Sequence, residues 1–124
     1  MLRADTVIMW LVAGLGLVLT IWHIAASQGR RRPPLLAGLL HGAMGIAGFA
    51  LFLWLLRQPR QVLLSSVHEI SQGAIAALAA AALIGIAYPL LAWRRVPFSP
   101  AVMILHIVVA MVGFVLFLGW AMVA

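Results

Sequence analysis

The stretch LHGAMGIAGFALFL (residues 40–53) places a histidine inside an apolar run, and LHIVVAMVGFVLFL (residues 105–118) repeats this pattern 65 positions later. Seven of the fourteen aligned positions are identical. About 20 consecutive apolar residues are long enough to cross a bilayer as an α-helix. Both stretches therefore predict membrane helices, and each helix carries one imidazole inside the apolar layer.

Two further apolar runs raise the number of predicted membrane helices to four. The runs cover residues 6–28, 35–56, 70–93 and 99–123. Apolar residues make up 66% of the chain and only two residues are acidic, which is too little charge to cover a water-soluble domain of 124 residues. Because the connections are short, consecutive helices are antiparallel neighbours. The sequence predicts one all-α domain, a four-helix up-down membrane bundle.

Two features near the ends of the runs predict helix boundaries. Ser99 followed by Pro100 is typical of an N-cap and the first residue of a helix. Pro89 lies inside the third run, where proline removes a backbone hydrogen bond. We therefore expect a bend or an early helix end near Tyr88.

The arginines predict the orientation in the membrane. We call the end of the bundle with the first and third turns side A, and the end with the middle turn and both termini side B. Side A carries Arg30, Arg31, Arg32, Arg94 and Arg95, and side B carries Arg3, Arg57 and Arg60. Positive residues concentrate on the cytoplasmic side, where anionic lipid headgroups are their counter-charges. We expect an integral protein of a bacterial inner membrane, with side A in the cytoplasm, both termini outside and no nucleic-acid partner.

The 65-residue offset predicts an internal duplication of a two-helix unit, residues 1–63 and 66–124. Since each unit crosses the membrane twice, both copies have the same orientation and are related by a pseudo-two-fold axis along the membrane normal. His41 and His106 should therefore face each other. The same offset pairs His23 with Tyr88, and a rise of 1.5 Å per residue puts all four side chains near one level, about 10 Å inside side A.

This histidine layer predicts a haem site. Cysteine is absent, so thiolate metal sites and c-type haem attachment are excluded. We expect His41 and His106 to be the axial ligands of one b-type haem, because iron satisfies imidazole lone pairs that would otherwise be costly in an apolar medium. His23 and Tyr88, with the side-A arginines, would bind the propionates.

Small residues lie on the helix faces that contain these histidines. Gly45 and Gly48 share a stripe with His41, and Gly113 shares one with His106, so we expect them to leave room for the macrocycle. The stripes through His23 and Tyr88 contain further small residues, among them Gly16 and Gly85. Alternatively, small residues let membrane helices pack closely without any cofactor.

Other ligands for the histidine layer stay open. His23 could be the third ligand of a copper or other metal site, with Met44, Met103 and Met111 as soft ligands or as core filler. The histidines could also serve packing, or contact a quinone or substrate. At side B, Ser66, His68 and Glu69 could line a quinone or proton-entry pocket, or simply form a solvated helix N-terminus.

The His41 and His106 pair in a four-helix bundle resembles the transmembrane bis-histidine cytochromes, such as the cytochrome b561 type and the b-type anchor subunits of respiratory enzymes. The resemblance implies one-electron transfer by a haem with both axial positions filled. Proteins of the b561 type typically hold two haems, whereas ligands for one are present in this sequence. We therefore expect an electron-transfer subunit, linked to quinone or to other redox subunits. Because almost no residues lie outside the predicted spans to carry substrate chemistry, we expect no catalytic residue and not a complete enzyme.

Two alternatives come from other functional classes. A small transporter generally needs an acidic residue inside the membrane, whereas Asp5 and Glu69 lie at the edges of the predicted spans. A cofactor-free accessory subunit would use its lipid-facing sides to stabilise a larger membrane complex.

Overall fold

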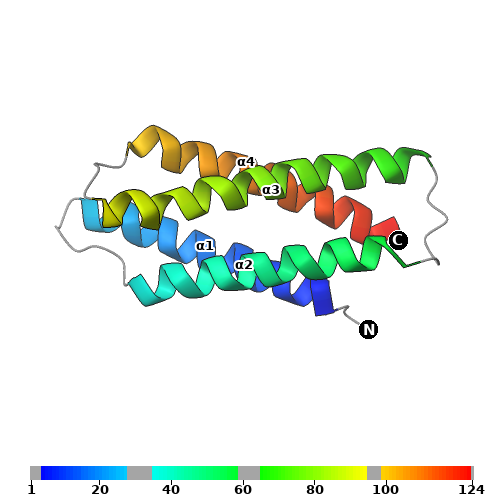
Figure 1. Cartoon of the computed structure of the whole chain (residues 1–124), viewed down its shortest axis with the longest axis horizontal. Helices are drawn as coiled ribbons and strands as arrows, with labels where there is room; N and C mark the ends of the chain where they lie inside the picture. Colours follow the sequence, from blue (N-terminus) through cyan, green and yellow to red (C-terminus); the bar gives the residue numbers. More distant parts are fainter. Residues whose placement is uncertain (1–3, 28–34, 59–64, 95–98, 124) are drawn as a thin grey trace.

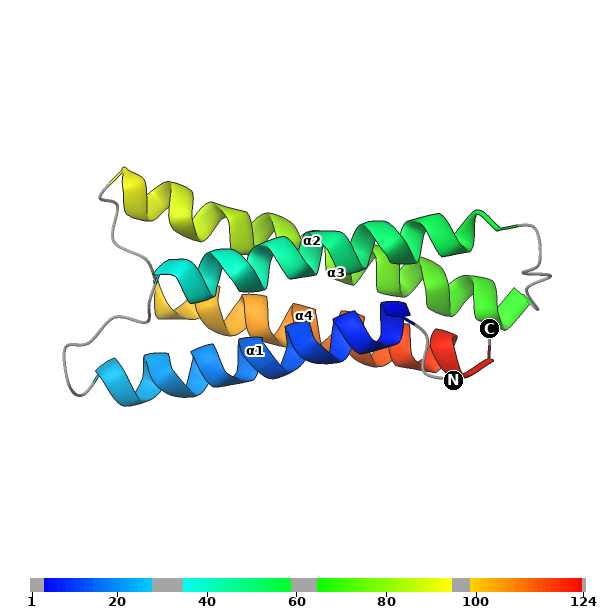
Figure 2. The same ribbon diagram turned by 90° about the horizontal axis from the view of Figure 1, so that it is seen from below.

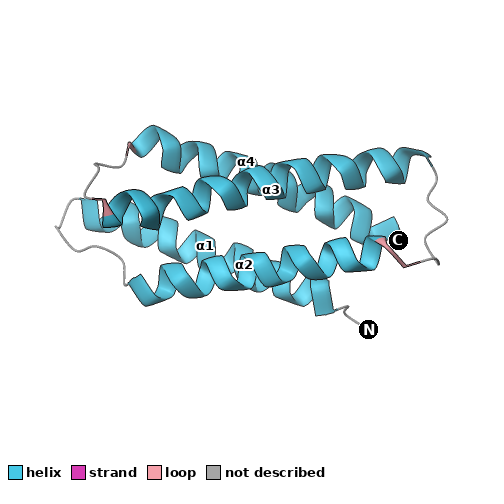
Figure 3. Cartoon of the chain, viewed as in Figure 1, coloured by secondary structure: helices cyan, strands magenta, loops and turns pink. Residues whose placement is uncertain are grey.

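Four α-helices make up the described part of the chain. The structure is a computed structural model that describes residues 4–27, 35–58, 65–94 and 99–123. Its helices are α1 (Ala4–Ser27), α2 (Leu35–Leu56), α3 (Ser65–Trp93) and α4 (Pro100–Val123), shown in Figure 1. Within the described ranges only a few residues beside the helix ends are not helical (Figure 3). The predicted all-α four-helix bundle is confirmed.

Each helix is long and apolar enough to cross a membrane. The candidate spans are Thr6–Ala25, Leu36–Leu56, Val67–Leu91 and Pro100–Val123. Large apolar side chains are exposed on all four helices, for example Leu36 (77% exposed) and Leu83 (70% exposed). An apolar outer surface of this extent suits contact with lipid and not with water. The chain is an integral membrane protein.

The helices form a bundle in which consecutive helices pack against each other, and α1 also packs against α4. In the described residues, no Cα atoms of the diagonal pairs, α1 with α3 and α2 with α4, come within 8 Å of each other. Figure 1 shows that α1 begins and α4 ends at side B. Both diagonal pairs lie farther apart toward side A, α2 and α4 in Figure 1 and α1 and α3 in Figure 2.

The third helix begins earlier than the sequence indicated and does not stop at its internal proline. It begins at Ser65, five residues before the predicted run. It also continues past Pro89 to Trp93, so the expectation of an early end near Tyr88 is wrong. Proline removes one hydrogen bond and leaves the Gly85 carbonyl without its backbone donor, but packing against neighbouring helices sustains a membrane helix across such a gap.

The predicted cap of α4 is present. The Ser99 hydroxyl accepts a hydrogen bond from the Ala101 N–H at 3.3 Å, and the Val102 N–H donates to the Ser99 carbonyl at 3.0 Å. Pro100 occupies the first helical position, where its missing N–H leaves no intrahelical bond unmade.

Replacing this cap is expected to destabilise the protein slightly. Ser99→Ala removes the acceptor for the Ala101 N–H and should lower the free energy of unfolding by about 1 kcal/mol. Thermal unfolding in detergent, followed by circular dichroism, measures this loss. Ser99→Asp keeps an acceptor and serves as the control. Equal melting temperatures for Ser99→Ala and the unmodified protein would contradict the capping role.

The tightly packed core lies in the side-B half of the bundle. Phe52, Phe117 and Trp120 are fully buried, and the Phe52 and Phe117 rings lie edge to face with centroids 5.2 Å apart. Of the residues that the structure describes, none on the side-A side of Ala81 is buried. The side-A half is therefore the more open half, in agreement with the spreading of the helices.

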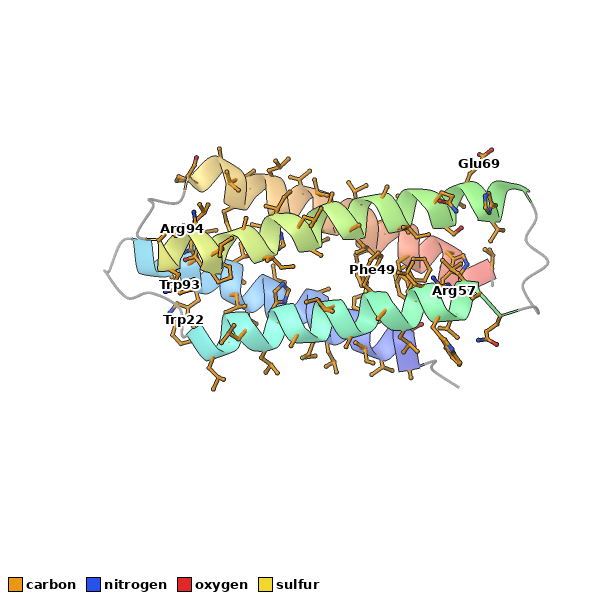
Figure 4. The ribbon with its side chains drawn as sticks, in the orientation of Figure 1. Trp22, Phe49, Arg57, Glu69, Trp93 and Arg94 are labelled. Carbon is orange, nitrogen blue, oxygen red and sulfur yellow. The ribbon has the colours of Figure 1, made fainter. Side chains whose placement is uncertain are left out.

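Only some of the residues that bear on the orientation in the membrane lie in the described part of the chain. Trp22, Trp93 and Arg94 lie at side A, and Arg57 and Glu69 lie at side B (Figure 4). The other basic residues named above, Arg3, Arg30, Arg31, Arg32, Arg60 and Arg95, lie outside the described residues.

Candidate functional site

The two histidines of the repeated stretch meet in the interior of the bundle. Their ring centroids are 6.4 Å apart and their ring planes lie at 79° to each other. His41 is on α2 and His106 is on α4, which are diagonal helices without close backbone contact. The side chains therefore reach toward each other across the bundle axis, and both are partly buried.

Each imidazole packs against a glycine of the preceding helix. A Cβ atom added to Gly16 of α1 would lie 2.8 Å from Cε1 of His41, and one added to Gly85 of α3 would lie 3.1 Å from Cε1 of His106. Any larger residue at either position would have to displace the ring. These glycines hold the imidazoles close to the backbone of α1 and α3.

A second close contact at a glycine occurs in both helix pairs, nearer side B. Gly48 of α2 packs against Met9 of α1, where an added Cβ would lie 3.0 Å from Sδ. Gly113 of α4 packs against Leu78 of α3, where an added Cβ would lie 2.9 Å from Cγ. The α1–α2 and α3–α4 pairs thus share two equivalent helix contacts.

These equivalent contacts correct the alignment of the first and third helices. His41 and His106, like Gly48 and Gly113, are 65 positions apart, but Gly16 and Gly85 are 69 positions apart, as are Met9 and Leu78. The extra four residues amount to about one helical turn, which preserves the face that each helix presents. The duplication itself stays a prediction, but Tyr88 is not the structural counterpart of His23.

The two imidazoles differ in their hydrogen bonds. Nδ1 of His106 lies 3.0 Å from the carbonyl oxygen of Ala81. A carbonyl only accepts, so this nitrogen carries the proton and Nε2 of the neutral ring keeps its lone pair. Nδ1 of His41 is buried without a partner. Val12, the counterpart of Ala81, lies beside the His41 ring, but its carbonyl is outside hydrogen-bonding geometry with Nδ1.

The predicted propionate ligands lie nearer side A than the histidine pair. His23 is seven residues beyond Gly16 on α1, which corresponds to about 10 Å along the helix. Tyr88 is three residues beyond Gly85 on α3, about one turn away. Both are partly buried. The single layer of four side chains predicted from the sequence is therefore two or three successive levels.

The three predicted cofactor-facing glycines lie in helix contacts instead. Gly48 and Gly113 pack as described above, and an added Cβ on Gly45 would lie 3.8 Å from the Val12 side chain. Their small size brings α2 close to α1 and α4 close to α3, as is usual in membrane bundles. The glycines that contact the imidazoles are Gly16 and Gly85. From the sequence, these two glycines were expected on the helix faces that carry His23 and Tyr88. No sequence signal marked these glycines, because the 69-residue offset between α1 and α3 becomes visible only in the contacts.

The described residues offer no third ligand for the alternative copper site at the histidine pair. In the described ranges, no three side chains of His, Cys, Asp or Glu lie close enough together to bind a metal ion. His23 is about two turns from the pair. Of the possible soft ligands, Met111 is exposed, whereas Met44 and Met103 are partly buried.

The side chains of two of the three side-B residues are described, and both are exposed. His68 and Glu69 are exposed in the first turns of α3, and Glu69 points away from the other helices (Figure 4). The Ser71 hydroxyl donates to the His68 carbonyl at 2.7 Å. The side chain of Ser66 lies outside the described residues.

The spacing of the two imidazoles matches that of two ligands on one iron. Two metal–nitrogen bonds of about 2 Å each, together with the inner halves of the two rings, span about 6 Å between centroids. The observed separation is 6.4 Å. The hydrogen bond from Nδ1 of His106 to a backbone carbonyl is also the usual second contact of a metal-binding histidine.

No match identifies a relative. Comparisons of the chain with protein families, with curated proteins and with solved structures found nothing similar. The function therefore has to be argued from the histidine pair.

Proposed function

We propose that this protein is a membrane cytochrome b in which His41 and His106 bind the iron of one b-type haem between α2 and α4. The observation that carries the proposal is the meeting of two imidazoles from diagonal helices at a centroid separation of 6.4 Å. His106 adds support, since its Nδ1–H is held by Ala81 and its Nε2 lone pair is free for iron.

The surroundings of the pair favour a flat apolar cofactor. The side-B half is filled by aromatic side chains, whereas the described residues nearer side A include none that is buried. A macrocycle at the level of the histidines would occupy the more open half and extend toward side A. His23 and Tyr88 lie one to two turns in that direction, where they would bind the propionates. His23 and Tyr88 would therefore contact the edge of the haem and not its iron.

A haem with two histidine ligands supplies reversible one-electron transfer between ferric and ferrous iron. The chain has no described site where a substrate would meet it, so we propose an electron-transfer subunit that works with quinone or with another membrane redox subunit. The excess of arginines in the sequence at side A favours a cytoplasmic side A and external termini, in a bacterial inner membrane.

An optical spectrum of the purified protein tests the proposal. The protein is expressed with haem available, purified in detergent, and measured oxidised and after reduction with dithionite. We expect about one haem per chain, with sharp reduced bands of a six-coordinate b-type cytochrome. These bands should be absent from both His41→Ala and His106→Ala, because each variant lacks one axial ligand.

His68→Ala is the matched control, since His68 is exposed at side B and should be dispensable for the spectrum. A colourless unmodified protein would refute the cytochrome and leave the accessory-subunit alternative. Loss of the bands in His23→Ala, with an unchanged spectrum in His106→Ala, would show that the wrong ligand pair had been chosen.

A further inference from the structure

The two haem ligands proposed above are held unequally. This inference rests on the proposed function and concerns the difference between its two histidines. The Ala81 carbonyl fixes the ring orientation and tautomer of His106 at 3.0 Å. Nδ1 of His41 is buried beside the Val12 backbone but makes no hydrogen bond of comparable geometry. Partners of this kind typically change metal affinity by about 10–100-fold.

The carbonyl of the glycine that packs against His41 already accepts a side-chain hydrogen bond. The Thr20 hydroxyl donates to the Gly16 carbonyl at 2.8 Å. Pro89 takes the place of Thr20 at the equivalent position of α3 and offers no donor. The backbone beside His106 therefore has spare acceptor capacity, whereas the backbone beside His41 has less.

Access to the two rings also differs on the side-A side. Gly38 lies three residues before His41, and an added Cβ there would meet nothing within 4 Å. The equivalent residue before His106 is Met103, which is partly buried. One turn before His106, α4 therefore carries a flexible thioether side chain, whereas one turn before His41, α2 carries no side chain.

The helix that carries His106 is the more firmly packed of the two. α3 and α4 pack together more extensively than any other helix pair of the bundle, and more than α1 and α2. At Gly113, an added Cβ would lie 3.0 Å from the backbone nitrogen of Leu78, so the two backbones are in close contact. His106 is consequently carried by the more closely packed helix pair.

We propose that His106 is the permanent haem ligand and that His41 is exchangeable, so that the haem face toward α2 accepts a small neutral molecule such as carbon monoxide. His106 would keep hold of the iron, and His41 would give up its place to the incoming molecule as one lone pair replaced another, without transfer of an electron. The site would then combine electron transfer with binding of a diatomic gas on one face.

Carbon monoxide and the two histidine variants provide the test. The reduced unmodified protein should bind carbon monoxide, with the shift of the Soret band that marks loss of one histidine ligand. His41→Ala should keep most of its haem and bind carbon monoxide faster than the unmodified protein. His106→Ala should show a haem affinity lower than that of His41→Ala by at least about tenfold, as expected for loss of the better-oriented ligand.

A further variant avoids changing either ligand. Gly38→Met reproduces the residue that precedes His106 and should slow carbon monoxide binding several-fold while leaving the reduced spectrum unchanged. Haem-replete protein that does not bind carbon monoxide, or equal haem loss in the two histidine variants, would overturn this inference and leave the cytochrome intact. A colourless unmodified protein would instead refute the proposed function itself.

Discussion

Gly16→Leu is expected to abolish the six-coordinate spectrum of the reduced protein. Even the first side-chain carbon at this position would lie 2.8 Å from Cε1 of His41, so the imidazole has to move. Metal–ligand distances tolerate changes of only about 0.2 Å, and a leucine requires a much larger displacement. Reduced-minus-oxidised difference spectra of the purified variant, compared at equal protein concentration, measure the loss.

Gly14→Leu is the matched control for this experiment. Gly14 lies on the same helix, but an added Cβ there would meet nothing within 4 Å. The control therefore changes helix propensity and lipid contact in the same way without touching the imidazole. We expect it to keep the spectrum of the unmodified protein. An unchanged spectrum in Gly16→Leu would show that the His41 ring is not held where the proposed function requires it.

Gly113→Leu is expected to have the largest effect on stability. An added Cβ at Gly113 would lie 2.9 Å from two carbons of the Leu78 side chain and 3.0 Å from its backbone nitrogen. Backbone atoms cannot rotate away as a side chain can, so α3 and α4 must separate. Overpacking commonly costs about 1–3 kcal/mol, and we expect the loss here to reach or exceed the upper end of that range.

Thermal unfolding of Gly113→Leu in detergent, with Gly42→Leu beside it, provides the measurement. Gly42 also lies within a membrane helix but has nothing within 4 Å of an added Cβ. Gly42→Leu should unfold near the temperature of the unmodified protein, or slightly above it because leucine has the higher helix propensity. Equal melting temperatures for the two variants would mean that the α3–α4 contact contributes little to stability.

The fold followed from the sequence because membrane helices are defined by length and apolar content. The runs that gave α2 and α4 agree with the structure to within one residue, and the Ser99-Pro100 start of α4 is confirmed. Two boundaries of α3 were misjudged: its start at Ser65 and the early end expected near Pro89. Proline is a strong signal against a helix in water, but in a bundle the neighbouring helices keep the chain helical beyond it.

The site could be predicted only in part, because sequence spacing gives the face of a residue but not its register against another helix. The histidines were expected to face each other, and their rings do lie together. The levels of His23 and Tyr88 depended on assuming one offset for the whole repeat. A shift of four residues between α1 and α3 keeps every face in place and changes every level, so periodicity alone could not reveal it.

The hydrogen bonds of the two rings were also beyond the reach of sequence. Ala81 acts through its main-chain oxygen, and a residue's identity says nothing about which imidazole its carbonyl meets. Likewise, the sequence does not distinguish a glycine that packs against a helix from a glycine that packs against an imidazole. Gly48 and Gly16 could be told apart only from the atoms that surround them.

The fully buried rings of Phe52, Phe117 and Trp120 separate the histidine pair from side B. Eleven residues of α2 lead from His41 to Phe52, which corresponds to about 16 Å. None of these three side chains is an acid or a base that could relay a proton. In the proposed cytochrome, a proton that accompanied reduction would therefore reach the imidazoles from side A.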